Sequence, residues 1–259
     1  MVQKPLRMSF LFCSLIFLLS TLIYSGCTEK SDKVGENSYD KSGETTGTPE
    51  LSVKGKEMFY ALSTETGLAC ADCHSDGTND ANSLTKFFSP VNGVPKRTST
   101  YHGMIKGEEV QNTAGGSTLC WQRYLGYQDE MTPEQINSLN AYFESIATAN
   151  DPTEIVYETL ALPERDKDKF KQVREEILGM TGDAVNGEKK FNEACAFCHS
   201  TETRVKDVPN LQEYEGDGRG VVYNTILGEE YMPFYHKDKL SYQDIADISE
   251  FVMTKVVQK

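Results

Sequence analysis

The feature that most constrains this chain is a short cysteine and histidine motif that occurs twice. The sequence Cys-Ala-Asp-Cys-His spans residues 70–74, and Cys-Ala-Phe-Cys-His spans residues 195–199. In the C-x-x-C-H pattern the histidine directly follows a pair of thiols, which is typical of covalent haem c attachment. A single C-x-x-C also suits a redox dithiol or half of a zinc site, but zinc requires two further ligands close by. The histidine after both pairs therefore predicts two covalently bound haem c groups.

This pattern gives each residue of the motif a role. Four thiols are expected to form thioether bonds to haem, and two imidazoles to bind iron from the proximal side. The thioether residues are Cys70, Cys73, Cys195 and Cys198, and the proximal ligands are His74 and His199.

The start of the chain is typical of an export signal. Lys4 and Arg7 precede an apolar run at 10–24, which is shorter than a membrane-spanning helix requires. Residues 1–26 are therefore predicted to be a signal peptide, with a retained N-terminal anchor as the alternative. The end of this segment, with Cys27, resembles a bacterial lipobox, except that Tyr24 stands where leucine or a small apolar residue is usual. Lipidation of Cys27 would anchor the protein to a membrane, facing the periplasm or cell envelope.

Composition supports an exported protein with a flexible tether. Residues 27–50 are rich in Ser, Thr, Gly and charged residues, so this segment is predicted to be a lipid-anchored flexible tether. Removing a signal peptide that holds Lys4 and Arg7 would change the formal charge from −13 to −15. Such a surface argues against nucleic acid as a partner and favours basic redox partner proteins, although solubility alone also explains it.

Two segments of the chain repeat one plan. Gly55 to Phe59 and Gly187 to Phe191 each lead into a haem motif, and helices starting after Thr132 and Ser241 each carry apolar residues at three-and-four spacing. The apolar residues are Ile136, Leu139 and Phe143 in the first copy and Ile245, Ile248 and Val252 in the second. This order resembles the cytochrome c domain. The prediction is a mainly α fold with two tandem cytochrome c-type domains, at 51–149 and 183–259.

A connecting helix is predicted between these domains. Residues 150–182 form the linker, in which 163–180 carries Phe170, Val173 and Ile177 on one side. The stripe is expected to pack between the domains.

Sequence context also favours one distal ligand in the second domain. Met232 precedes Pro233 shortly before the last predicted helix, and methionine with histidine is a common haem c ligand pair. His236 and Met253 are the alternatives, with a loop-surface role expected for His236 and a packing role for Met253.

The first domain has no Met-Pro pair. Met131 aligns with Leu240 just before a predicted helix, so it is expected to be a hydrophobic staple. Cys120 is the soft donor of segment 119–126, where the distal ligand is expected. It is also the cysteine left over once haem attachment, lipidation of Cys27 and loss of Cys13 with the signal peptide are taken into account. A Cys120 thiolate ligand and a buried free thiol both remain open.

A family resemblance bears on Cys120. Residues 68–78, followed by Cys120-Trp121-Gln122-Arg123 and Gly126, resemble the first domain of the dihaem thiosulfate dehydrogenases and the related SoxA-type sulfur-oxidising cytochromes. The resemblance implies that Cys120 binds the iron of the first haem and that Arg123 matches the family's arginine. Tyr124 and Leu125 replace a serine and a methionine of that family, and one residue is missing before Gly126.

Two principal functions follow from these observations. The first is a periplasm-facing dihaem cytochrome c lipoprotein that transfers single electrons between redox partners. The second is an oxidoreductase of the thiosulfate dehydrogenase type, with Arg123 or Lys106 available to hold a small sulfur anion. A redox sensor with a ligand-binding distal site is the third class.

Overall fold

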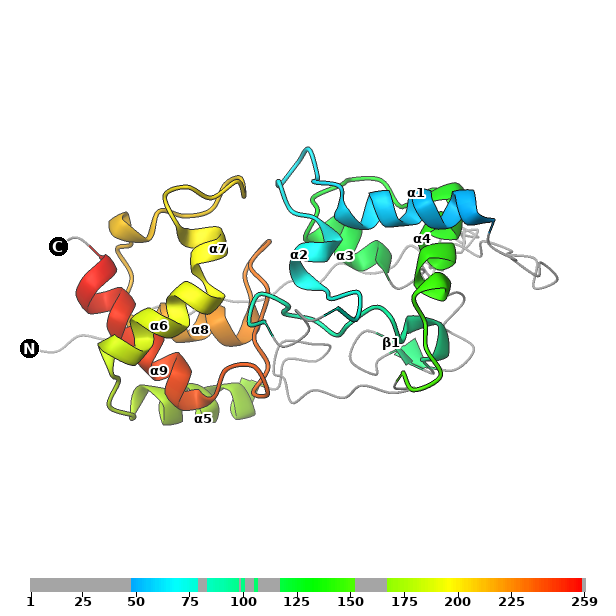
Figure 1. Ribbon diagram of the computed structural model, residues 1–259. Helices are drawn as coiled ribbons and strands as arrows, with labels where there is room; N and C mark the ends of the chain where they lie inside the picture. Colours follow the sequence, from blue (N-terminus) through cyan, green and yellow to red (C-terminus); the bar gives the residue numbers. More distant parts are fainter. Residues whose placement is uncertain are drawn as a thin grey trace, which may run out of the picture. The chain divides into compact units, whose positions relative to one another are not determined.

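The computed structural model of the chain describes residues 48–78, 83–97, 99–100, 105–106, 117–151 and 167–257. These residues belong to one compact unit, 42–259, and are mainly helical (Figure 1). The predicted signal peptide, Cys27 and nearly all of the predicted tether lie outside the described residues. None of the described helices is both long and apolar enough to span a bilayer.

The first helical half comprises residues 48–151. Its helices are α1 (Pro49–Tyr60), α2 (Cys70–Cys73), α3 (Ser117–Arg123) and α4 (Pro133–Ser145), with the single 3-10 turn η1 (Val94–Lys96) among its described residues. Two short strands, β1 (Ser99–Thr100) and β2 (Ile105–Lys106), pair antiparallel. Helix α1 begins inside the segment predicted to be tether, because Pro49 suits the first turn of a helix.

Helices α1 and α4 cross in close contact and form the core of this half (Figure 1). Gly55 is what allows their close approach, since a Cβ atom there would lie 1.9 Å from the backbone oxygen of Ser138. Phe59, one turn later, is 1% exposed and packs against the rings of Tyr142 and Phe143.

The second helical half comprises residues 167–257. Its elements are α5 (Lys167–Leu178), α6 (Ala184–Ala194), α7 (Ala196–His199), η3 (Leu211–Glu213), α8 (Gly218–Leu227), α9 (Tyr242–Phe251) and the π-helical turn η4 (Val252–Val256). Helices α6 and α9 cross in close contact, as α1 and α4 do (Figure 1). A Cβ atom on Gly187 would lie 2.0 Å from the backbone oxygen of Asp247, so the two halves use glycine at the same kind of helix contact.

The two predicted N-caps are confirmed. Thr132 caps α4 and Ser241 caps α9, each by accepting a hydrogen bond from the backbone N–H three residues on. In both cases the side chain of that third residue, Gln135 or Asp244, accepts a hydrogen bond from the N–H of the cap residue, completing a capping box. The predicted apolar stripes of both helices are buried, and Met131 is buried directly before its cap, where a staple is expected.

The connecting helix packs differently from the prediction. Val173 and Ile177 are buried, but α5 lies against α8 and α9 of the second half. The ring of Phe170 meets that of Tyr223 at 5.2 Å. Helix α5 is therefore part of the second half, because its apolar residues are buried in the same cluster as residues of α8 and α9.

Aromatic side chains join the two halves. Phe87, from the loop after the first motif, contacts Tyr235 with ring centroids 5.1 Å apart, and Phe88 contacts Phe234 at 5.4 Å. All four rings are buried in one hydrophobic cluster. The two halves thus share part of their core.

Candidate functional site

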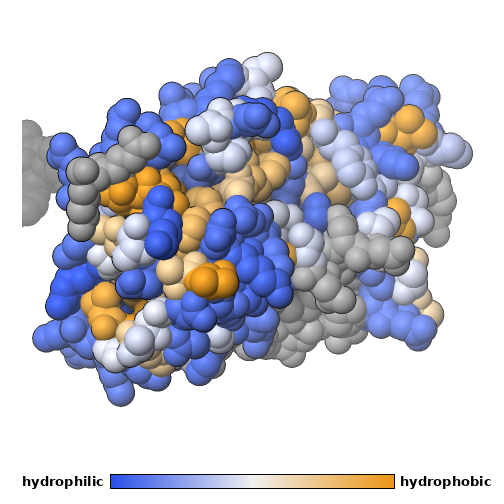
Figure 2. Space-filling view, turned by 60° about the vertical axis from the view of Figure 1, so that its left-hand side comes forward, coloured by the Kyte–Doolittle hydropathy of each residue, from blue (hydrophilic) through white to orange (hydrophobic). Residues whose placement is uncertain are grey.

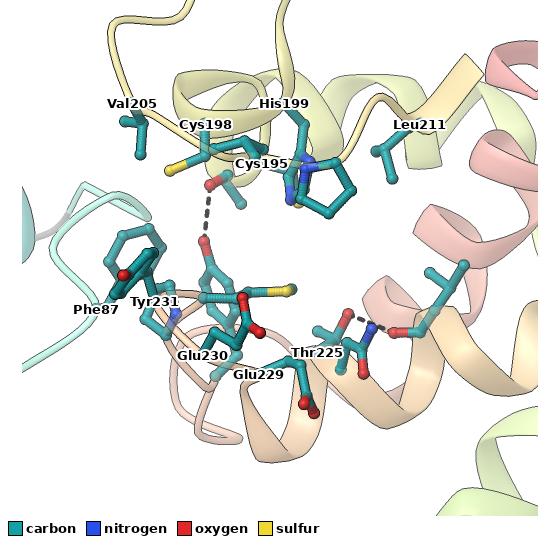
Figure 3. A pocket seen from close by; sticks show the side chains of 18 of the residues that line it. Phe87, Cys195, Cys198, His199, Val205, Leu211, Thr225, Glu229, Glu230 and Tyr231 are labelled. Atoms are coloured by element: carbon teal, nitrogen blue, oxygen red, sulfur yellow. Dashed lines mark hydrogen bonds between the residues drawn. The ribbon is translucent and has the colours of Figure 1, made fainter. Parts of the chain in front are cut away.

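The second motif forms one wall of an apolar pocket. Cys195 caps the end of α6 and His199 ends α7, so the turn between these helices presents both thiols and the imidazole to the pocket. Figure 3 shows Cys195, Cys198 and His199 along one side of the cavity. Much of the remaining lining is apolar and comes from Phe191, Val208, Leu211, Val221, Ile248 and Val252. Figure 2 shows hydrophobic residues gathered in patches among polar ones on this side of the molecule.

The imidazole of His199 is held by its surroundings. The His199 backbone N–H donates to the Cys195 carbonyl at 2.9 Å, which fixes the residue at the end of its turn. Burial lowers the pKa of His199, and the nearby carbonyl of Pro209 opposes that change. Its Nδ1 atom is buried and forms no hydrogen bond within standard geometry. A buried imidazole beside a backbone carbonyl is suited to binding a metal through one of its ring nitrogens.

Met232 lies in the segment that forms the opposite wall. Its backbone N–H donates to the Glu229 carbonyl at 2.6 Å, closing a tight turn, and Met232 lines the same pocket as His199. Glu229 and Glu230, just before it, lie across the cavity from His199 (Figure 3). The structure therefore brings the predicted proximal and distal residues of the second half to one cavity.

The two alternatives to Met232 are placed differently. The expected surface position of His236 is wrong, because the residue is 2% exposed, and its carbonyl accepts hydrogen bonds from the N–H groups of Lys239 and Leu240 in a turn before α9. Met253 is half-buried in η4. Neither residue is among those that line the pocket.

The first motif has the same local geometry. The His74 N–H donates to the Cys70 carbonyl at 3.0 Å, and the His74 Nδ1 atom donates to the Ser89 carbonyl at 2.7 Å. Arg97 holds the accepting loop through the hydroxyl of Ser89 and the carbonyl of Pro90. A histidine whose Nδ1 is fixed in this way has its Nε2 available to bind a metal.

Cys120 lies close to the first motif. It belongs to α3 and is partly buried, and its thiol is near enough to Cys70 and Cys73 to raise the pKa of each, after the larger effect of burial. Burial raises the pKa of Cys120 itself to about 11, against an opposing effect of Arg123. Without a metal the thiol is neutral, and a coordinated metal is what would deprotonate it.

The anion-binding candidates are only partly described. Arg123 is half-buried, and its guanidinium lies 5.3 Å from the centre of the Tyr124 ring. Lys106 is in β2, but its side chain lies outside the described residues. Tyr124 and Leu125, which depart from the sulfur-oxidising family, are both buried.

Several residues of the second pocket escaped sequence reasoning. Leu68, Cys73 and Phe87 of the first half line it together with residues of the second half. Contacts between halves leave no periodic pattern in a single sequence. Pro209, which lines the pocket near His199, also went unnoticed, since a single proline in a loop does not indicate which residue its carbonyl faces.

The arrangement as a whole fits a large apolar macrocycle with a central metal. Paired thiols and an oriented imidazole lie on one wall, a thioether side chain belongs to the segment opposite, and apolar side chains fill the rim. Burial raises the pKa of Cys195 to about 12, which reflects the same apolar surroundings.

Comparisons with known proteins agree with this geometry. Residues 182–252 match the family model described as cytochrome C oxidase, cbb3-type, subunit III. A stretch of 82 residues is 30% identical to cytochrome c6 of Diacronema lutheri, covering 29% of this chain and 98% of that protein.

Proposed function

Because this chain belongs to the c-type cytochromes, we propose that it is a dihaem cytochrome c that carries single electrons between redox partner proteins. The observation that carries the proposal is the pocket that brings Cys195, Cys198, His199 and Met232 together. The match to the family model covers this half of the chain.

Each of these residues has a defined part in holding haem. The two cysteines would supply the thioether attachment, His199 would bind the iron from one side and Met232 from the other. A bound haem c supplies reversible one-electron transfer. The apolar lining would keep water away from a bound haem. A thioether ligand from Met232 would favour ferrous iron, so the reduction potential of this haem is expected to be relatively high.

The first half supports a second haem by the same reasoning. Cys70 and Cys73 stand in a helical turn that ends at His74, and the Ser89 carbonyl orients its imidazole. We propose Cys120 as the distal ligand, because this soft donor is partly buried and packs against the hydrophobic cluster that contains Cys73. An anionic thiolate stabilises ferric iron, so this site is expected at lower potential than the site with Met232.

The position of Cys120 also favours a second candidate function. A low-potential haem with Arg123 nearby suits oxidation of a small sulfur anion, with electrons leaving through the second half. Tyr124 and Leu125 fill space where the sulfur-oxidising family has smaller or different residues, and both are packed into the core. We therefore place electron carriage before catalysis.

Haem loading is the first test of the proposed function. Mass spectrometry of acetone-extracted protein is expected to show two covalent haems per chain. Cys70→Ala and Cys195→Ala are each expected to lose or weaken one haem, because thioether attachment needs both thiols of a motif. A matched control is Cys120→Ala, which should retain both haems by mass. An apo mass for the wild-type chain would refute the proposal.

We further propose that the protein is exported and anchored to a bacterial membrane through lipid on Cys27. The support is the charged start, the apolar run and the lipobox-like end of residues 1–27. Wild-type protein is expected in the membrane fraction, and Cys27→Ser in the soluble fraction or uncleaved. Cys13→Ser is the control and should behave as wild type. A mature protein that keeps Met1 to Gly26 would contradict lipidation and indicate a retained anchor.

A further inference from the structure

The attachment cysteines of the two motifs converge on one region between the halves. Cys73 lines the pocket that contains Cys195 and Cys198. Cys73 is 7% exposed, and burial raises the pKa of its thiol well above the ordinary value, with smaller contributions in the same direction from Asp72, Cys120 and Cys198. Tyr235, whose hydroxyl donates to the Ala194 carbonyl at 2.8 Å, lines the same pocket as Cys73, Cys195 and Cys198.

An ion pair crosses the halves beside these cysteines. The Arg204 guanidinium contacts Asp72 Oδ1 at 2.6 Å, and Asp72 directly precedes Cys73 in the first motif. The same guanidinium lies 4.9 Å from the centre of the Phe197 ring, inside the second motif. One side chain therefore touches a residue of both motifs.

The chain around Arg204 is also fastened through its backbone. The Lys206 N–H donates to the Thr66 carbonyl at 2.9 Å, and the Lys206 ammonium donates to the Thr64 carbonyl. Gly67 has φ +76°, and a Cβ atom there would lie 2.4 Å from the Arg204 carbonyl oxygen. The two backbones thus approach as closely as a glycine permits.

The energetics indicate that the ion pair sets position more than stability. At the side chain Arg204 is 45% exposed and Asp72 14% exposed, so solvent around the guanidinium screens the pair and limits its contribution to folding stability. Asp72 Oδ2 also accepts a hydrogen bond from the Ala69 N–H at 2.8 Å, so the carboxylate is fixed on both oxygens. Because both oxygens of the Asp72 carboxylate are held, the ion pair fixes the position of the Arg204 guanidinium.

We propose that Asp72 and Arg204 form a clasp that holds the thioether edges at Cys73 and Cys198 against each other, and that these two positioning residues set the electronic contact between the two haems. The inference rests on the proposed dihaem function. With one edge of each haem tied to its motif, the clasp fixes the shortest route between them. A single electron leaves one reduced haem and enters one oxidised haem, with no bond made and no proton moved.

The test compares holoprotein variants that remove the clasp without disturbing its neighbours. Arg204→Met keeps an unbranched side chain over Phe197, and Asp72→Asn keeps an oxygen for the Ala69 N–H. The readouts are haem content by mass, circular dichroism in the Soret band, and the rate of electron equilibration between haems after flash reduction. Wild type is expected to show a Soret couplet from interacting haems. Both variants should lose it and equilibrate more slowly, with two haems retained.

The controls separate positioning from general damage. Arg219→Met removes the Arg219–Glu175 pair, which joins α8 to α5 at 2.8 Å away from the motifs, and should keep the couplet. Arg204→Lys retains the charge and should restore much of it. Variants with two haems and unchanged couplet and rate would overturn the clasp, as would its loss in Arg219→Met. A wild-type chain with one haem would instead overturn the dihaem function.

Discussion

Replacing Met232 with alanine is expected to lower the reduction potential of the second haem by on the order of 0.1 V or more, within the roughly 0.8 V range that axial ligands span. Methionine ligation favours ferrous iron, so its loss stabilises the oxidised state. The far-red absorption band of methionine-bound ferric haem should disappear as well. A redox titration followed by visible spectroscopy measures both effects, and the first haem should be unaffected.

Two variants serve as controls for this prediction. Met253→Ala removes a half-buried methionine of η4 that does not line the pocket and should leave the spectrum unchanged. His236→Ala should reduce stability, because that side chain is 2% exposed, while keeping the methionine band. If Met232→Ala retained the methionine band, Met232 would not be the ligand, whatever the effect of His236→Ala.

The second large effect concerns Cys120. Replacing Cys120 with methionine is expected to raise the potential of the first haem by on the order of 0.1 V, because a neutral sulfur replaces an anionic one. Cys120→Ala should also change the spectrum of this haem, since it removes the donor. The second haem, titrated in the same sample, provides the internal control. Unchanged behaviour of the low-potential haem in Cys120→Ala would remove the thiolate hypothesis.

The same variants decide between carrier and enzyme. A steady-state assay with thiosulfate and ferricyanide is expected to show weak turnover or none in the wild type. Arg123→Gln tests anion binding directly, because it removes the cation while keeping a side chain beside Tyr124. Strong wild-type turnover that vanishes in both Cys120→Ala and Arg123→Gln would make the sulfur oxidoreductase the better assignment.

Local sequence signals were enough to predict the helices that frame each motif. Thr132 and Ser241 have the side chains that cap a helix, and the residues after them repeat with helical spacing, so these elements follow from short-range chemistry. The grouping of Cys195, Cys198 and His199 follows in the same way, because one turn contains all three.

Contacts between distant segments were the part that sequence reasoning missed. His236 was expected at the surface of its loop because it lacks the neighbouring proline that follows Met232, yet its side chain is buried. Helix α5 was expected between the domains, but its stripe packs on α8 and α9. The Asp72–Arg204 pair joins residues that are far apart in the chain. Neither charged residue indicates, from the sequence around it, which residue it pairs with.

The glycine-centred helix pairs have a consequence for how the chain folds. Helix α1 must find α4, and α6 must find α9, across long intervening segments, so each half closes through a non-local contact. During synthesis α4 is complete before α6 has been made, and α9 follows α5, α6 and α8, against which it packs. The first half can therefore assemble early and present the carbonyl of Thr66 and the rings of Phe87 and Phe88 as a template on which the second half completes its core.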